Sequence, residues 1–140
     1  MTEKNDYWAH VDLNEIPDIS VPPPGPKSEE WHSRCTRYFK GLSGQVKLFP
    51  VTFESGHGCV LRDADGNRYI DFSSGIYVTT LGHCHPKVTE AVCNAARNLQ
   101  NAHDFTTPIK TRLMEKMAEV LPGDLSGFQI YDSGTTAVEA

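Results

Sequence analysis

The sequence lacks the features that mark membrane and secreted proteins. No apolar run approaches the roughly 20 residues needed to cross a bilayer. Residues 1–6 are polar and show no signal-peptide apolar region. The four cysteines have no regular framework spacing, so we expect reduced thiols in a cytoplasmic protein.

The chain also has little net charge and no long run of one sign. Its formal charge is -5 over 140 residues, which argues against nucleic acid or an anionic membrane as the main partner. A hydrophobic fraction of 39% with 22% charged residues is typical of a globular protein. The length suffices for one modest domain with a core.

Two familiar phosphate-binding motifs are absent as well. No Gly-Lys-Ser/Thr sequence ends a Walker A loop, and no Gly-x-Gly-x-x-Gly dinucleotide fingerprint is present. No Lys or Arg follows Lys116, so any anion bound near the end of the chain would be held by neutral donors.

The last residues nevertheless predict such a site. Alternation over residues 128–131 predicts a short strand, which the small hydroxylic loop Ser133-Gly-Thr-Thr136 follows. A capping box with Thr136 at the N-cap and Glu139 reaching back then predicts a helix start. Free N–H groups and the helix dipole would favour a phosphate there. An ordinary capped helix after a strand is the alternative.

The rest of the chain predicts an α/β pattern. Residues 1–28 form a Pro-rich extended arm, and Ser28 is predicted to cap a helix that ends near Gly41. A turn at 63–67 separates two strands. The predicted strand segments are 51–53, 59–62 and 68–72. Helices are predicted to begin at Pro86 and at Thr107-Pro108. The first has one apolar face, formed by Val88, Ala91, Val92, Ala95 and Leu99, and the second has a buried stripe, formed by Ile109, Leu113, Met117, Val120 and Leu121.

Two other chemistries have little support in the sequence. His83-Cys84-His85 invites a zinc site with His57 and Cys59, but the spacing lacks the pairs that shape a tetrahedral site. Cys84 lacks the surroundings of an acyl-transfer nucleophile.

A calcium loop beginning at Asp63 is also rejected. Gly66 falls two places early for such a loop, and the twelfth position is Ser74 rather than Glu. We therefore predict no metal site.

Four stretches together resemble one family. They are Pro24-Gly-Pro-Lys-Ser28, Asp63-Ala-Asp-Gly-Asn-Arg-Tyr-Ile-Asp-Phe72 with Ser74-Gly-Ile76, Gly82-His-Cys-His-Pro86, and Ser133-Gly-Thr-Thr-Ala-Val-Glu-Ala140. In order and approximate spacing they are similar to the class III aminotransferases, and the first most resembles the 4-aminobutyrate aminotransferase branch.

The resemblance implies an α/β fold of the fold type I pyridoxal phosphate enzymes. It implies an N-terminal arm (1–28), the N-terminal part of a small domain with its strands (29–80), and the start of the large cofactor-binding domain (81–140). Pyridoxal 5'-phosphate would be the cofactor, cradled by Ser133, Gly134, Thr135 and Thr136. Ile76, Tyr77 and Phe105 would line the substrate pocket.

The same resemblance implies that this chain is the N-terminal part of a longer homodimeric enzyme. The catalytic residues, a Schiff-base Lys and a pyridinium Asp, are expected beyond residue 140. The implied reaction moves an amino group from an ω-amino acid, such as 4-aminobutyrate, to a 2-oxo acid. An acetylornithine-type transaminase, an aminomutase, or a non-catalytic fragment that binds a phosphate-bearing ligand or a partner chain remain alternatives.

Overall fold

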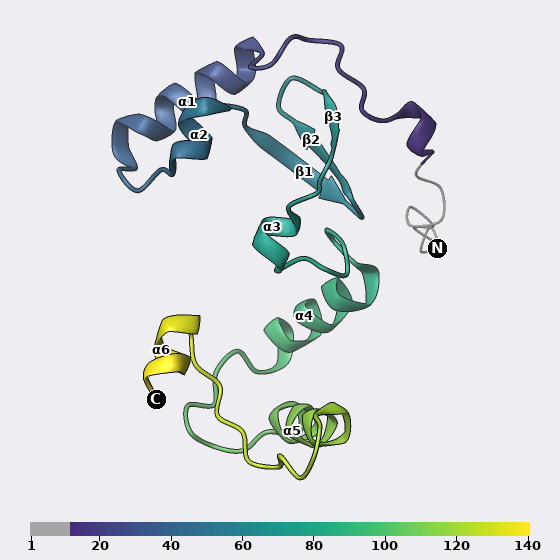
Figure 1. Cartoon of the computed structure of the whole chain (residues 1–140), viewed down its shortest axis with the longest axis vertical. Helices are drawn as coiled ribbons and strands as arrows, with labels where there is room; N and C mark the ends of the chain where they lie inside the picture. Colours follow the sequence, from purple (N-terminus) through teal and green to yellow (C-terminus); the bar gives the residue numbers. More distant parts are fainter. Residues whose placement is uncertain (1–11) are drawn as a thin grey trace. The chain divides into compact units, whose positions relative to one another are not determined.

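The computed structural model describes residues 12–140, so the first eleven residues of the predicted arm lie outside it. The chain divides into two compact parts, Met1–Asn94 and Ala95–Ala140. In the described residues the helical segments are η2 (Leu13–Glu15), α1 (Pro26–Tyr38), α2 (Gly44–Leu48), α3 (Ser74–Tyr77), α4 (Pro86–Asn98), α5 (Pro108–Val120) and α6 (Gly134–Glu139) (Figure 1). None of these helices is long and apolar enough to span a membrane.

A three-stranded antiparallel sheet forms the centre of the first part. Its strands are β1 (Phe53–His57), β2 (Val60–Asp63) and β3 (Arg68–Ile70), in the order β1-β2-β3. Gly58, at φ 56°, lies in the tight connection between β1 and β2. The second and third predicted strands are confirmed. The first is corrected, because β1 begins where the predicted segment 51–53 ends and its ladder with β2 extends to His57.

The best-buried side chains of this part are polar. Asp63 and Asn67 are fully buried, whereas Ile16 and Val60 are the buried apolar residues among those whose side chains are described. Asp63 Oδ1 accepts hydrogen bonds from the N–H groups of Asp65 (3.0 Å) and Asn67 (2.8 Å). Its Oδ2 accepts from Asn67 Nδ2 (2.9 Å) and from the hydroxyl of Tyr69 (2.8 Å). This network fixes the predicted turn at 63–67.

The same network reaches the segment before α1. The Asn67 side chain accepts from the backbone N–H of Val21 and donates to the Val21 carbonyl, both at 2.9 Å. Asp18 and Arg68 exchange backbone hydrogen bonds of 3.0 and 2.8 Å. Residues 18–21 are therefore tied along the sheet rather than detached from it.

Tyr69 offers a measurement of this network in solution. Its partial burial, followed by the hydrogen bond that it donates to Asp63, raises the pKa of Tyr69 to about 12. A folded-state pKa above the ordinary value of 10 means that the stabilisation is complete below pH 10 and is lost as pH rises toward 12. We expect ultraviolet titration to show this tyrosine ionising last, and Tyr69→Phe to remove that step. If all five tyrosines of the chain titrated near pH 10, this prediction would be wrong.

Helix α1 begins earlier than predicted. Pro26 is its first residue, Gly25 its N-cap, and Ser28 lies buried inside the helix rather than capping it. The Asp65 carboxylate accepts from the N–H groups of Lys27 (2.9 Å) and Ser28 (2.8 Å), and so satisfies donors that a local cap would otherwise take. Partial burial acts to raise the pKa of Asp65, but the hydrogen bonds from the backbone of Lys27 and Ser28 contribute to lowering it overall.

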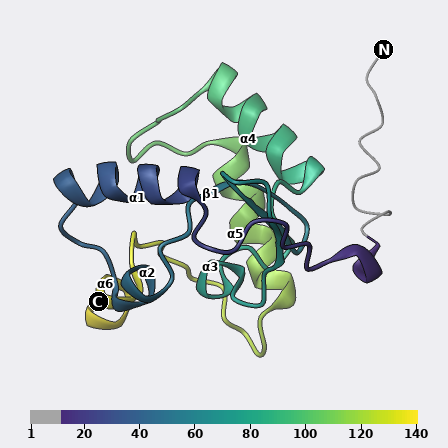
Figure 2. The ribbon, with the colours of Figure 1, turned by 90° about the horizontal axis from the view of Figure 1, so that it is seen from above.

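The end of α1 also differs from prediction. The helix ends at Tyr38, three residues before Gly41, and a short loop leads into α2, which was not predicted; both ribbon views show this order (Figure 1 and Figure 2). The starts of α4 at Pro86 and of α5 at Pro108 are confirmed. Thr107 caps α5, its hydroxyl accepting from the N–H of Lys110 at 3.2 Å.

Two further predictions are wrong in the described chain. The stripe of α5 that was predicted to be buried is exposed, with Ile109 at 64%; the apolar face of α4 is exposed as well, with Val92 at 61%. Residues 128–131 form no strand, because no segment of residues 12–140 pairs with them in a β-ladder. A strand exists only through its hydrogen-bonded neighbour, so alternation of side chains was not sufficient.

Candidate functional site

The predicted phosphate loop is a capped helix start. Ser133 is extended (φ -149°, ψ 158°) and is the N-cap of α6. Its Oγ accepts from the N–H of Thr136 (3.2 Å), and Thr136 Oγ1 accepts from the N–H of Ser133 (3.3 Å). The capping box is therefore Ser133 with Thr136, not Thr136 with Glu139. The helix begins one turn earlier than predicted, because Thr136 can serve as the reciprocal hydroxyl partner.

This cap leaves two backbone donors without an acceptor. Ser133 and Thr136 are committed to the capping box, and the N–H of Ala137 donates to the Ser133 carbonyl at 3.1 Å. No acceptor within the described chain faces the N–H groups of Gly134 and Thr135, the first two residues of α6. A Cβ placed on Gly134 would meet no atom within 4 Å. The start of α6 is thus open to a ligand.

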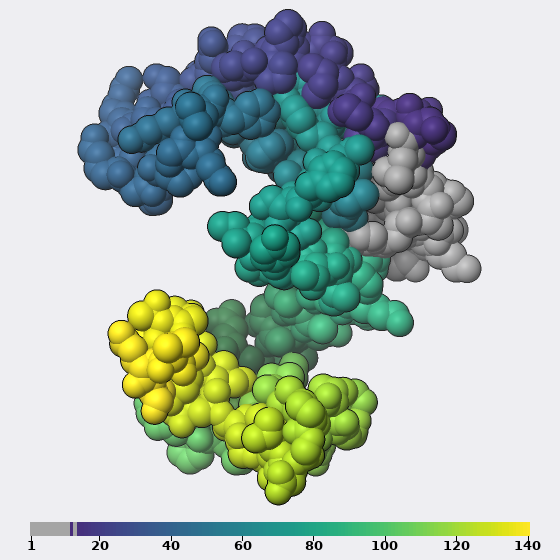
Figure 3. Space-filling view, in the orientation of Figure 1, coloured from purple at the N-terminus to yellow at the C-terminus, as the bar shows by residue number. Residues whose placement is uncertain are grey.

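The surroundings of these donors are exposed and uncharged except for one carboxylate. All residues of α6 are exposed (yellow in Figure 3). Thr136 Oγ1 donates to Asp132 Oδ1 at 2.9 Å. Free N–H groups at a helix start suit an anion such as a phosphate. Of the four predicted cradle residues, Gly134 and Thr135 therefore supply free donors, while Ser133 and Thr136 build the cap.

The predicted substrate residues Ile76 and Tyr77 lie on an unusual turn, α3. Four consecutive residues have positive φ: Ser74 (49°), Gly75 (62°), Ile76 (61°) and Tyr77 (65°). The N–H groups of Tyr77 and Val78 bond to the carbonyls of Ser73 (3.0 Å) and Ser74 (2.9 Å). A left-handed turn costs about 1–2 kcal/mol per residue for L-amino acids, and a β-branched residue there is exceptional.

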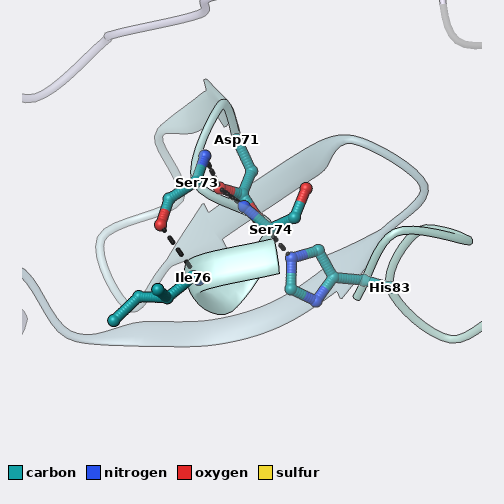
Figure 4. Close-up of polar contacts among 5 residues, drawn as sticks. All are labelled: Asp71, Ser73, Ser74, Ile76 and His83. Atoms are coloured by element: carbon teal, nitrogen blue, oxygen red, sulfur yellow. Dashed lines mark hydrogen bonds and ion pairs between the residues drawn. The ribbon is translucent and has the colours of Figure 1, made fainter. Parts of the chain in front are cut away.

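Asp71 supports this turn, as Figure 4 shows. Its Oδ1 accepts from the N–H groups of Ser73 (2.8 Å) and Ser74 (2.9 Å), and Ser73 Oγ accepts from the N–H of Ile76 (3.3 Å). Asp71 Oδ2 lies 2.7 Å from His83 Nε2. The hydrogen bond to His83 is the main cause that lowers the pKa of Asp71. Strain of this kind is found where a surrounding structure holds a functional residue in place.

Sequence reasoning missed the role of Asp71. An Asp two residues before Ser73-Ser74-Gly75 is the signal of an Asx turn, and it was available in the sequence. In the sequence His83 suggested only a metal ligand, a role that its spacing argued against. The structure instead pairs its Nε2 with the Asp71 carboxylate.

Phe105 lies in the second compact part, on the loop before α5. Its side chain is 78% exposed. Lys110 Nζ holds this loop by donating to the carbonyls of His103 (2.8 Å) and Phe105 (3.1 Å). Phe105 is therefore presented on a fixed loop rather than packed into a core.

The first compact part thus contains a strained turn that exposes apolar side chains, and the second contains a helix start with free donors. Residues 42–140 match the family described as aminotransferase class-III. The match covers more than half of the chain, and the chain belongs to this family. Class III aminotransferases are pyridoxal phosphate enzymes, so the predicted cofactor is confirmed at the level of the family.

The chain is similar to relatives with several activities. It is 35% identical over 135 residues to an alanine/serine racemase of Pyrococcus horikoshii, covering 95% of this chain and 28% of that protein. It is 40% identical over 103 residues to a glutamate-1-semialdehyde 2,1-aminomutase of Legionella pneumophila, covering 72% and 22%. The chain thus spans about a quarter of the length of these relatives.

Solved structures agree on the fold. An acetylornithine aminotransferase from Elizabethkingia anophelis is similar, with a TM-score of 0.66 and 27% identity, over 80% of this chain and 28% of that one. The predicted α/β fold of the fold type I pyridoxal phosphate enzymes is therefore confirmed. These relatives do not single out the 4-aminobutyrate branch.

Proposed function

We propose that the chain is the N-terminal portion of a pyridoxal phosphate-dependent aminotransferase whose cofactor phosphate is held at the start of α6. The observation that supports this is the pair of N–H groups at Gly134 and Thr135, which have no acceptor in the described chain. A Cβ added at Gly134 would meet no atom within 4 Å. The capping box holds the loop in the shape that leaves them free. When bound, the cofactor supplies the electron sink for amino-group chemistry.

We propose that Ile76, Tyr77 and Phe105 line the substrate pocket. Ile76 and Tyr77 are 76% and 81% exposed although they are large and apolar, and a strained turn fixes their positions. The proposed substrates are an ω-amino acid, such as 4-aminobutyrate, and a 2-oxo acid. The aminomutase and the acetylornithine aminotransferase among the similar proteins support a second candidate within the same family. Comparison of these amino donors at one enzyme concentration discriminates the two.

The catalytic Lys and the pyridinium Asp are proposed to lie beyond residue 140. Two of the seven lysines lie in the same compact part as α6, and both have structural partners. Lys110 donates to two carbonyls, and Lys116 pairs with Glu119 on α5. A homodimer and a cytoplasmic location are part of the same proposal. The exposed apolar faces of α4 and α5 support burial against further protein surface.

The test of this proposal is covalent trapping. We expect the 140-residue chain, mixed with pyridoxal phosphate and reduced with borohydride, to show no single stoichiometrically labelled Lys. It should not transaminate 4-aminobutyrate with 2-oxoglutarate, because that reaction needs a Lys amine at the reacting carbon. Peptide mapping identifies any labelled residue, and Lys110→Arg is the matched control. One fully labelled Lys with turnover would refute the proposal.

A further inference from the structure

Asp71 joins the left-handed turn to a second anchor, His83. Asp71 comes directly after β3, and its N–H continues the sheet by donating to the Cys59 carbonyl at 2.8 Å. One carboxylate oxygen serves the backbone of Ser73 and Ser74, and the other serves His83. The carboxylate is therefore held on one side by an imidazole while it orders the turn on the other.

His83 is itself fixed from the backbone. Its N–H donates to the Gly58 carbonyl (2.9 Å), and its carbonyl accepts from the Gly58 N–H (3.0 Å), so it pairs with the β1-β2 connection. A Cβ on Gly56 would lie 3.0 Å from His83 Cγ, which means that the imidazole packs against a bare backbone. The side chain of His83 is 22% exposed and that of Asp71 is 7% exposed.

The turn needs support from Asp71 because its backbone conformation is energetically unfavourable. Three of its four residues have side chains, and each resists positive φ. Short charge-assisted hydrogen bonds from a nearly buried carboxylate are among the stronger contacts available to offset that cost. The carboxylate can offer them only while its own orientation is fixed, and the contact with His83 at 2.7 Å fixes it.

We propose that His83 is a positioning residue, acting through Asp71 to hold Ile76 and Tyr77 in the left-handed turn that shapes the amino-donor side of the pocket. The inference rests on the proposed function. His83 need not touch the substrate or the cofactor in this role. His83 supplies a hydrogen-bond donor at the position of Nε2. A side chain with a donor at that position should therefore preserve the turn, and a side chain without one should not.

The test compares two substitutions in the complete aminotransferase that includes this chain. His83→Gln keeps an N–H donor at the same number of bonds from the backbone, whereas His83→Phe keeps the ring volume and removes the donor. We expect H83F to raise the KM for the amino donor about 10-fold with kcat changed much less, because substrate contacts shift slightly. H83Q should remain close to wild type. His32→Phe on α1 is the control for adding an aromatic ring elsewhere.

A second readout follows the turn directly. Positive φ gives strong N–H to Hα nuclear Overhauser effects within Ile76 and Tyr77, and these can be measured in the 140-residue chain. We expect them in wild type and H83Q and expect their loss in H83F. A wild-type chain without them, or H83F equal to H83Q in both readouts, overturns the proposal. A complete wild-type protein that binds no pyridoxal phosphate overturns the proposed function instead, and the turn measurement still decides the role of His83.

Discussion

Asp63→Ala is expected to destabilise the first compact part by about 3 kcal/mol or more. The substitution removes the acceptor of four hydrogen bonds in a site with no exposure. The N–H of Asn67 and the hydroxyl of Tyr69 would be left inside without their partner, and each unsatisfied buried donor costs about 1–3 kcal/mol. The described apolar core around this network is small, so few other contacts offset the loss. For a domain of ordinary stability, about 5–15 kcal/mol, this is a large fraction.

Urea unfolding of the 140-residue chain measures this effect, with circular dichroism as the signal. Glu54→Ala is the matched control, because Glu54 is a carboxylate on the adjacent strand β1, 60% exposed and paired with Arg62 at 3.3 Å. We expect the control to change the free energy of unfolding by less than about 1 kcal/mol. Asp63→Asn should fall between, since its amide oxygen can still accept while its NH₂ group faces two donors. Equal midpoints for D63A and E54A would show that the buried network contributes little.

The parts of the fold that follow from local chemistry could be predicted from the sequence. Pro86 and Pro108 mark helix starts because a fixed φ and a missing N–H suit the first helical residue. The turn at 63–67 follows from its Asp, Gly and Asn residues. The start of α1 could not be predicted, because Asp65, its capping carboxylate, is 37 residues from Ser28 in sequence. A pattern read along the chain does not reveal a partner at that separation.

The candidate site shows the same division. The loop Ser133 to Thr136 could be recognised, but not which hydroxyl caps the helix, since Ser133 and Thr136 both satisfy the residue preferences. Ile76 and Tyr77 were identified by family resemblance, yet nothing local predicts positive φ at an isoleucine. That conformation depends on a contact between Asp71 and His83, 12 residues apart. Tertiary contacts thus decide the geometry of a site whose residues are visible in the sequence.

Gly134→Asp is expected to weaken the affinity of the complete enzyme for pyridoxal phosphate by about 100-fold or more. The new carboxylate would stand at the first residue of α6, beside the two free N–H groups. Two like charges about 4 Å apart near a protein surface repel by about 4 kcal/mol, and each 1.4 kcal/mol is a factor of about 10 in affinity. The same substitution should stabilise the helix start by about 0.3–1 kcal/mol, because an acidic residue favours the positive end of the dipole. If G134D instead lost affinity because it unfolds, its free energy of unfolding would fall rather than rise.

Equilibrium dialysis with pyridoxal phosphate and with pyridoxal, which lacks the phosphate, isolates the effect. Gly134→Asn is the matched control, since it adds a side chain of nearly the same size without charge and a Cβ at this position meets no atom within 4 Å. We expect G134D to lose most of the preference for the phosphorylated form and G134N to keep most of it, with thermal unfolding of the two variants close to wild type. An equal loss in both variants would mean that bulk, not charge, governs the site. An unchanged preference in G134D would mean that the phosphate is not held at the start of α6. A carboxylate placed there would repel a phosphate dianion bound at the same helix start.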